Sequence, residues 1–389
     1  MPDTPDTISR PVVVAGCGAI TAVGCGVDQL EAALRQNVSG LRPVEQFHSP
    51  RFQSNIVGAA LPDADIEDPA YWLATAALGQ AVAEARTVLG SLDRARIALV
   101  LATTKANINA LERLADGRPC GASARRHLQG DLLAADLALE HGAHGPVRCV
   151  STACVSGLIA LSRGAALIQN GSADAVLVAG VDHLSAFIVA GFTALKAIDP
   201  QGCRPFDRDR CGLSPGEAGA AMVLVRADLA PPDALVIRAW GGSNDANHLT
   251  GPSRDGSGLA QAIRSALDAA RLAPAEIDYI NVHGTGTPYN DAMESKALHT
   301  VFGAECPPVS AFKGMLGHTL GAAGVVETIG CVLALRGGFL PGTPGLAMPD
   351  EGVPASLVRV PRAASRLKQV MKLNTGFGGI NGALILGYG

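Results

Sequence analysis

Apolar and polar positions along the first 230 residues predict strands and helices in turn. Short apolar or β-branched runs bounded by glycine or polar residues predict buried strands, and four segments have this form: Pro11–Ala15, Ile97–Leu101, Arg148–Val150 and Ala175–Ala179. The first run is expected to stop at Gly16 and Gly18. Stretches with helical spacing lie at 27–35, 71–90 and 153–169. Strands that are apolar on both faces belong to sheets covered on both sides, so the pattern predicts a layered α/β fold.

The second part of the chain repeats this order, with strands expected at Ala234–Ala239 and Tyr279–Val282 and helices at 258–271 and 321–335. In each part a reactive side chain, Cys154 or His318, stands at or just before an Ala- and Gly-rich helix. The repetition predicts two related halves with reactive residues at their junction. The proline-rich segment Leu229–Asp233 is the expected boundary, so the halves are residues 1–230 and 231–389.

Composition narrows the class of protein. Of 389 residues 48% are hydrophobic and 17% charged, which excludes a disordered chain, and a net charge of −4 argues against nucleic acid as a partner. The sequence has no run of 18 apolar residues and starts without a basic and then apolar segment, so we expect neither a membrane span nor a secretory signal. Nine cysteines without a CxxC pair predict reduced thiols in a cytoplasmic protein.

Cys154, in VSTACVSG, is the first candidate for chemistry. An apolar strand runs into a sharp turn and a helix begins close to the cysteine, an arrangement typical of nucleophile elbows. The positive end of the helix dipole and its unpaired N–H groups are expected to stabilise a thiolate. The ordinary alternative for a cysteine is a small buried apolar residue. The small residues around Cys154 favour the nucleophile.

His283, in NVHGTGTPYND, ends an apolar strand and leads into a Gly-Thr loop. Glycine permits close approach of the backbone to a ligand, and the hydroxyls of Thr285 and Thr287 could hold a polar, extended substrate. Considered alone, the motif is equally compatible with a histidine that only bonds to backbone.

Two further motifs carry candidates. In SAFKGMLGHTLGAAG, Lys313 and His318 precede the second small-residue helix. A lysine in apolar surroundings needs a partner because burial of an unpaired ammonium is unfavourable, and Glu327 is the nearest acidic candidate. In NTGFGGING, glycines flank Phe377 and predict a tightly turned loop with exposed N–H groups, although an ordinary turn has the same composition.

Other kinds of site have less support. Zinc sites usually include a short-spaced ligand pair; none links Cys154, His283 and His318, so we expect no metal. GxGxxG is absent, which leaves a dinucleotide site without support. GLSPG around Ser214 matches a hydrolase elbow in letters only, because a charged loop precedes it and a strand, not a helix, is expected after it.

Together these motifs resemble the β-ketoacyl-acyl-carrier-protein synthases, the condensing enzymes of fatty acid and polyketide assembly, in their elongating Cys-His-His form within the thiolase-like superfamily. The resemblance covers nearly the whole chain in order and spacing: VVVAGCGAITAVG, VSTACVSG, CRPFDRDRCGLSPGEAGAAMVLV, YINVHGTGTPYNDAMESKAL, SAFKGMLGHTLGAAG and GFGGINGALIL. It implies a five-layered αβαβα sandwich of two related halves, usually dimeric.

The resemblance also implies roles for single residues. Cys154 is similar to the nucleophile that accepts an acyl chain, and His283 and His318 to the paired histidines that stabilise the enolate formed by malonyl decarboxylation. Lys313 resembles the structural lysine beside them and Phe377 the gating phenylalanine. The N–H groups of Cys154 and Phe377 would hold the tetrahedral oxyanion.

Some positions depart from the family pattern. Thr375 stands where many members have an aromatic residue before the gating Gly-Phe, which could leave room beside the acyl chain. Cys211 and Leu213 replace an acid and an aromatic after Arg210. The segment ATTKANINAL is similar to condensing enzymes of aryl-polyene pigment clusters, which act beside a chain-length-factor partner.

The resemblance implies an acyl carrier protein as partner, which delivers phosphopantetheine, so no cofactor of the chain's own is expected. An acidic carrier needs a basic patch on a negatively charged enzyme. The candidates are Arg204, Arg208 and Arg210, followed by Arg125 and Arg126. The second subunit would be another copy of the chain or a chain-length-factor-like protein.

Three alternatives belong to other classes. A thiolase would have a second cysteine where Phe377 stands, and a condensing enzyme that starts from coenzyme A would have asparagine where His318 stands. The remaining alternative is a non-catalytic, chain-length-factor-like subunit. Such subunits generally lack the cysteine, so Cys154 with both histidines favours the enzyme.

Overall fold

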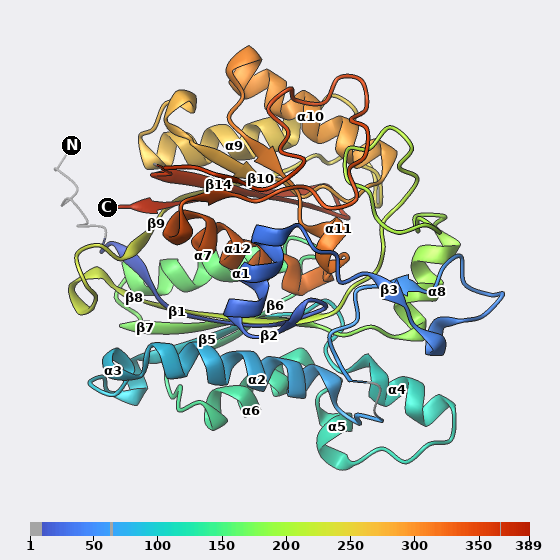
Figure 1. The fold of residues 1–389 in the computed structure, drawn as a ribbon. Helices are drawn as coiled ribbons and strands as arrows, with labels where there is room; N and C mark the ends of the chain where they lie inside the picture. Colours follow the sequence, from blue (N-terminus) through green and yellow to red (C-terminus); the bar gives the residue numbers. More distant parts are fainter. Residues whose placement is uncertain (1–9, 63–64, 366) are drawn as a thin grey trace.

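The first layer of strands lies in the N-terminal part of the chain (Figure 1). The computed structural model describes residues 10–62, 65–365 and 367–389. Across this layer the strand order is β6–β5–β7–β8–β1, with bounds β1 Val12–Thr21, β5 Ile97–Ala102, β6 Val147–Val150, β7 Ala175–Asp182 and β8 Ala218–Arg226. β5 runs parallel to both β6 and β7, whereas β8 is antiparallel to β7 and to β1.

The second layer repeats this topology strand for strand. Its order is β11–β10–β14–β15–β9, with bounds β9 Leu235–Asn244, β10 Tyr279–Asn281, β11 Val309–Ser310, β14 Gln369–Gly376 and β15 Ile380–Tyr388. β10 is parallel to β11 and β14, and β15 is antiparallel to β14 and β9. The same order with the same directions shows that the fold consists of two related halves. β1 pairs with β9 and joins the two layers at one end.

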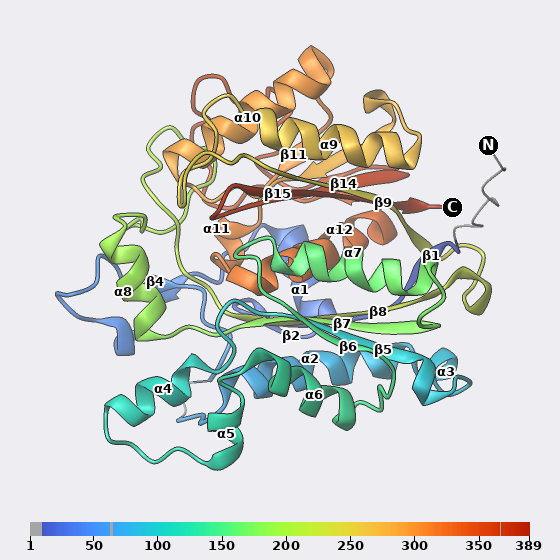
Figure 2. The same ribbon diagram turned by 180° about the vertical axis from the view of Figure 1, so that it is seen from behind.

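Helices cover both faces of each layer, as Figures 1 and 2 show from opposite sides. One outer layer packs on the first sheet and contains α2 Pro69–Glu84, α3 Arg86–Leu89 and α6 Gly130–Glu140. The middle layer lies between the sheets and contains α1 Val27–Gln36, α7 Ser156–Gln169 and α12 Ala323–Gly337. The other outer layer contains α9 Ser257–Ala270 and α10 Pro288–Phe302. The expected five-layered αβαβα sandwich is confirmed.

Shorter elements extend from the layers. The helices among them are α4 Ile108–Ala115, α5 Ala122–Arg126, α8 Ala186–Ala194 and α11 Lys313–Leu316. The strands are β2 Gly24–Cys25, β3 Arg42–Pro43, β4 Ile56–Val57, β12 Phe339–Leu340 and β13 Arg362–Ala363. In Figure 1, α4, α5 and α8 project from one end of the layers.

The expected end of the first strand is wrong. β1 continues through Gly16 and Gly18 to Thr21. Both glycines lie against the backbone of α2, where a Cβ atom would collide with the carbonyl groups of Ala81 and Ala77. Glycine here permits a close strand–helix approach instead of ending the strand.

The middle layer holds a long apolar helix. The segment Leu320–Gly337, which includes α12, is long and apolar enough to cross a membrane, but 89% of it is buried inside the structure. Its side chains pack on α7 and on both sheets. The segment is therefore the core helix of a layered protein.

Candidate active site

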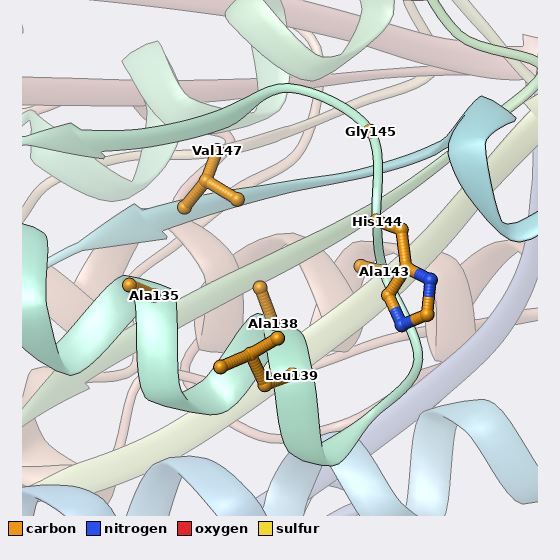
Figure 3. A pocket seen from close by; sticks show the side chains of 7 residues that line it. All are labelled: Ala135, Ala138, Leu139, Ala143, His144, Gly145 and Val147. Carbon is orange, nitrogen blue, oxygen red and sulfur yellow. The ribbon is translucent and has the colours of Figure 1, made fainter.

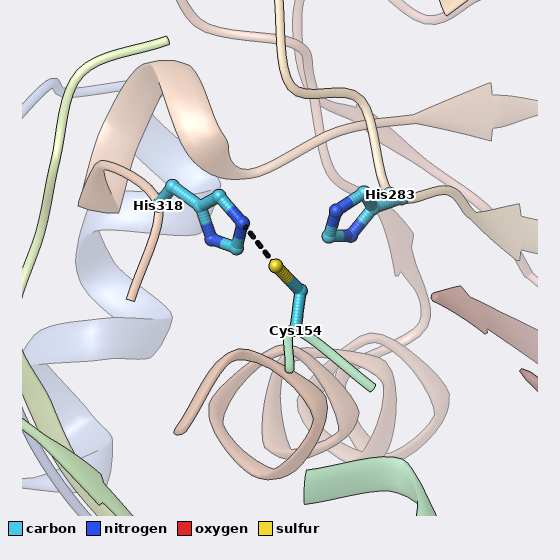
Figure 4. Close-up of side chains that lie close together, drawn as sticks. All are labelled: Cys154, His283 and His318. Atoms are coloured by element: carbon cyan, nitrogen blue, oxygen red, sulfur yellow. Dashed lines mark hydrogen bonds between the residues drawn. The ribbon is translucent and has the colours of Figure 1, made fainter. Parts of the chain in front are cut away.

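The three candidate reactive side chains, Cys154, His283 and His318, lie together between the two halves (Figure 4). Sγ of Cys154 is 3.0 Å from Nε2 of His318. The centres of the two imidazole rings are 5.1 Å apart and the rings are nearly perpendicular, at 84°. All three side chains are buried. The fold thus joins residues far apart in the sequence in one site shielded from bulk water.

A strained turn presents the thiol. Between the end of β6 and the start of α7, Ala153 has a left-handed backbone with φ of 50°, which costs a non-glycine residue free energy. Ser156 holds the turn: its Oγ accepts the N–H of Thr152 at 2.8 Å and donates to the carbonyl of Ala153 at 2.6 Å. Cys154 therefore points out of the turn toward the histidines.

Burial opposes the thiolate that the sequence predicts at Cys154. Burial raises the pKa of the Cys154 thiol to about 11, and this outweighs the charge of Lys313 and the N–H groups of Phe377 and Cys154, which lower it. Desolvation of a buried anion is the largest effect at this position. The thiol is therefore protonated at neutral pH, and its proton must leave during thioester exchange.

His318 is neutral and its proton can be assigned to one nitrogen. Burial, followed by the charges of Lys313 and Lys372, lowers the pKa of His318 well below its usual range. Its Nδ1 atom accepts the N–H of Leu320 at 3.2 Å, so the proton is on Nε2 and points toward the sulfur. The backbone N–H of His318 bonds to the carbonyl of Ser214 at 2.7 Å.

His283 follows β10 and is held by a buried carboxylate that the sequence interpretation missed. Glu294 on α10 accepts the backbone N–H groups of His283 and Gly284, both at 2.7 Å. Nδ2 of Asn374 lies 3.0 Å from Nδ1 of His283. Burial and the charge of Lys313 lower the pKa of His283 well below its usual range, so this imidazole is neutral as well.

A buried cluster of charges lies behind the histidines. Lys313 pairs with Glu327 at 2.7 Å, as the sequence suggested, and donates to the carbonyl of His283 at 2.7 Å. Lys372, which the sequence interpretation did not identify, lies 2.7 Å from the other oxygen of Glu327 and donates to the carbonyl of Val282 at 3.2 Å. Two lysines share one carboxylate, and their charges oppose protonation of the histidines.

A cavity of about 1020 Å³ leads from the surface to the three reactive groups. Thr285 and Thr287 line it, and their hydroxyls are 2.8 Å apart. Thr375 lines it too, but its hydroxyl donates to Oδ1 of Asn290 at 2.7 Å. Phe377 lies in the turn between β14 and β15, 37% exposed, with its ring centre 6.2 Å from that of Phe192. Both aromatic residues line the cavity that contains the thiol.

The structure separates the arginines predicted for docking. Arg204 and Arg210 are committed to internal carboxylates: Arg204 pairs with Asp199 at 3.0 Å, and Arg210, with a side chain only 6% exposed, pairs with Asp350 and lies 3.5 Å from the buried Asp291. These ion pairs leave Arg204 and Arg210 less accessible to a carrier than Arg208.

Arg208 remains accessible, with 55% of its side chain exposed. Three exposed cations that the sequence interpretation missed line the cavity: Lys196, Arg254 and Lys296. Lys196, Arg254 and Lys296 thus provide accessible positive charge at the cavity, where an anionic partner would meet it.

The reactive groups could also hold a metal ion, because Sγ of Cys154 and ring nitrogens of His283 and His318 lie within 4.8 Å of one another. The spacing of these residues along the sequence did not suggest metal ligands, because the three residues come together only in the fold. The chemistry proposed below uses the three groups without a metal.

Sequence comparisons with known families and proteins cover nearly the whole chain. The β-ketoacyl synthase N-terminal domain matches residues 9–230 and the β-ketoacyl synthase C-terminal domain matches residues 234–347. The 3-oxoacyl-(acyl-carrier-protein) synthase 2 of Vibrio cholerae is 33% identical over 410 residues, covering 97% of this chain and 98% of that protein. The tetracenomycin polyketide synthase ketoacyl synthase alpha subunit of Streptomyces glaucescens is 31% identical over 412 residues, covering 97% of each.

Solved structures agree. The ishigamide ketosynthase/chain length factor superposes with a TM-score of 0.89 at 32% identity, covering 98% of this chain and 100% of that one. The ketosynthase ApeO in complex with its chain length factor ApeC, from Xenorhabdus doucetiae, gives a TM-score of 0.84 at 30% identity and full coverage of both chains. With the duplicated sandwich and matches along nearly its whole length, the chain belongs to the β-ketoacyl synthase family.

Proposed function

We propose that Cys154 carries the growing acyl chain in the decarboxylative condensation that this β-ketoacyl synthase catalyses. In the first half-reaction the Cys154 sulfur attacks the thioester of an acyl carrier protein. The acyl–sulfur bond to Cys154 forms, the bond to the carrier's phosphopantetheine breaks, and the thiol proton ends on the departing carrier sulfur. The Nε2–H of His318, 3.0 Å from Sγ, stabilises negative charge on the sulfur during the exchange.

In the second half-reaction, malonyl-acyl carrier protein loses CO₂ and becomes an enolate. Its thioester oxygen receives hydrogen bonds from Nε2 of His283 and of His318, which act as an oxyanion site in a dry pocket. The enolate carbon attacks the acyl group on Cys154, while the N–H groups of Cys154 and Phe377 hold the new oxyanion. Collapse releases β-ketoacyl-acyl carrier protein and the sulfur, which takes a proton from water.

One observation carries this proposal: a buried thiol faces two neutral imidazoles, and the Nδ1 atom of each accepts a hydrogen bond, which leaves the proton on Nε2. Neutral imidazoles donate to an enolate without protonating it, whereas imidazolium groups would quench the carbanion. The buried lysines Lys313 and Lys372 favour the neutral form of both rings. Thr285, Thr287 and Thr375 line the cavity, which supports a role for the first two in holding the pantetheine arm and for Thr375 in shaping the adjoining space.

We also propose that the second subunit binds along β6, either as another copy of the chain or as a chain-length-factor-like protein. Within the described residues β6 has a strand neighbour on one side only. Beside it lies an apolar hollow of about 410 Å³ (Figure 3), and Leu139 in its wall is 69% exposed. An open strand edge next to exposed apolar side chains is typical of a surface covered in the assembly.

The test is the mass of the intact protein after incubation with acyl carrier proteins loaded with chains of different length. An acyl adduct should form, peptide mapping should place it on Cys154, and malonyl-acyl carrier protein should then remove it as a β-keto product. The protein is assayed alone and with its chain-length-factor-like partner. If no carrier-bound acyl group labels Cys154 in either state, the non-catalytic subunit becomes the correct interpretation.

A further inference from the structure

The side chain of Asn374 faces the ring of His283 from the next strand. Asn374 lies on β14, which pairs with β10, the strand that precedes His283. Nδ2 of the amide is 3.0 Å from Nδ1 of the ring, and both side chains are buried. Bulk water therefore does not compete for this contact. Hydrogen bonds are stronger in such a buried environment than in water.

An amide nitrogen can only donate, so the ring nitrogen that it faces must accept. A neutral imidazole has one N–H, and with Nδ1 accepting, that proton is on Nε2. The ring stays neutral because burial, followed by the charges of Lys313 and Lys372, lowers the pKa of His283. The two conditions together leave a single form of His283, with a donor at the nitrogen that faces the reaction.

The two histidines reach this form by different means. Nδ1 of His318 accepts the backbone N–H of Leu320, a donor that only a proline at position 320 would remove. His283 depends on the side chain of Asn374. A change at position 374 can therefore alter the proton position on one histidine and leave the other intact.

We propose that Asn374 is a positioning residue that fixes the Nε2–H tautomer of His283 and so determines whether this histidine can donate to the substrate oxygen. The inference rests on the proposed function only where it assigns that donor to the enolate. The tautomer itself is a property of the free protein.

Asn374→Asp is the most informative variant, because a carboxylate accepts where the amide donates. The proton of neutral His283 should then move to Nδ1, and Nε2 should lose its donor. Release of CO₂ from malonyl-acyl carrier protein should fall on the order of 10²- to 10³-fold at neutral pH, as when one oxyanion donor is removed. Acylation of Cys154 should change much less, because His318 lies beside the sulfur.

The pH profile separates positioning from a purely structural role. On acidification, His283 in Asn374→Asp gains a second proton, recovers the Nε2–H and should regain part of its decarboxylation. Asn374→Ser has a hydroxyl that can still donate to Nδ1 and so does not force the proton onto that nitrogen, and it should show no such recovery. Asn281→Ser on the neighbouring β10, where the amide bonds to the carbonyl of Ser310, is the matched control for removal of a buried amide and should retain decarboxylation.

The ¹⁵N shifts of the histidine rings in the wild-type protein test the inference even if a variant fails to fold. The ring signals of His283 are assigned because they are missing from the spectrum of His283→Ala. They should show an unprotonated Nδ1 and a protonated Nε2. Oδ1 of Asn374 has no hydrogen-bond partner among the described residues, so the opposite amide orientation would give a protonated Nδ1. That result, or equal pH profiles for the Asp and Ser variants, would overturn the inference whether or not Cys154 accepts an acyl chain.

Discussion

The turns that begin α7 and α12 are built alike and carry different chemistry. Ala153 and Leu320 occupy the same place, three residues before the start of their helices, with left-handed φ angles of 50° and 51°. At the next position the N-terminal half has Cys154 and the C-terminal half has Gly321. The two helices cross where Gly157 meets Gly324, and a Cβ on either glycine would clash with the other segment.

The halves differ in what lies between strand and turn. In the N-terminal half the turn follows β6 directly, whereas the C-terminal half inserts α11, which carries Lys313, and then His318. Asp182, at the end of β7, accepts the N–H of Gly321 at 2.7 Å, so the first half also fixes the turn of the second. Duplication therefore supplies two equivalent turns. The site lies where the N-terminal turn has the nucleophile Cys154 and the C-terminal turn is preceded by the donor His318.

The largest expected effect comes from breaking the buried charge cluster of the C-terminal half, in which Lys313 and Lys372 share Glu327. Glu327→Gln leaves Lys313 and Lys372 buried without their shared carboxylate. Loss of one partner in a buried ionic group typically lowers the free energy of unfolding by about 3–5 kcal/mol, which denaturant titration measures. Glu31→Gln, which removes the exposed pair with Arg35 on α1, should cost less than about 0.5 kcal/mol. Equal effects would contradict the importance assigned to the cluster.

The next largest effect is expected at the crossing of α7 and α12, which both halves share. Gly157→Ala would place a Cβ 2.8 Å from the backbone nitrogen of Val325, and such overpacking typically costs about 1–3 kcal/mol. Because the crossing positions both turns, acylation and decarboxylation should fall together. Gly79→Ala in α2, where a Cβ meets no atom within 4 Å, should stabilise the protein by up to about 1 kcal/mol through helix propensity. Selective loss of one half-reaction in Gly157→Ala would show that the crossing serves only one turn.

Lys372→Met tests whether the charge cluster of the C-terminal half controls the pKa of His283. Burial comes first among the causes that lower the pKa of His283, and the charges of Lys313 and Lys372 add to it. Without Lys372 the pKa of His283 rises, so the imidazole becomes charged at a higher pH on the acid side. The acid limb of the condensation profile should move to higher pH, because an imidazolium protonates the enolate before it attacks the acyl group, while the profile of Cys154 alkylation should move less. An unchanged acid limb would remove Lys372 from this role.

The smallest effect is expected on the surface. Arg208→Glu should raise KM for acyl carrier protein a few-fold and leave kcat unchanged, and the difference should shrink as salt screens the charges. Arg210→Glu should instead lower kcat and stability, because Arg210 is buried near Asp291, which accepts the backbone N–H groups of Phe206 and Gly286. If both variants change only KM, the assignment of Arg210 to internal structure is wrong.

Much of the fold could be predicted because its strands are continuous apolar runs. β5 and β7 and helices α1 and α9 lie within a few residues of their expected bounds. The failures involve contacts that local patterns do not contain. Gly16 and Gly18 resemble a strand end until α2 is seen packed against them. α7 begins at Ser156 instead of 153, because the residues before it form the turn that presents the thiol.

Site residues could be predicted where they belong to a distinctive local motif. Residues that only the fold brings to the site could not. Cys154, His283, His318 and the Lys313–Glu327 pair stand in distinctive local sequences. Lys372 and Asn374 lie in an apolar strand, MKLNTG, whose partners are about 90 residues away. Their alternate spacing placed them on one face, but only the pairing of β14 with β10 shows which face meets His283.

The central claim is that the N-terminal turn holds the acyl chain and the C-terminal histidine pair forms the enolate. It is tested most directly by measuring the acyl adduct and CO₂ release in Cys154→Ala and His283→Ala. Cys154→Ala should form no adduct and no condensation product but still release CO₂ from malonyl-acyl carrier protein. His283→Ala should still form the adduct while CO₂ release falls on the order of 10²- to 10³-fold. Condensation by Cys154→Ala, or undiminished CO₂ release by His283→Ala, would contradict the account.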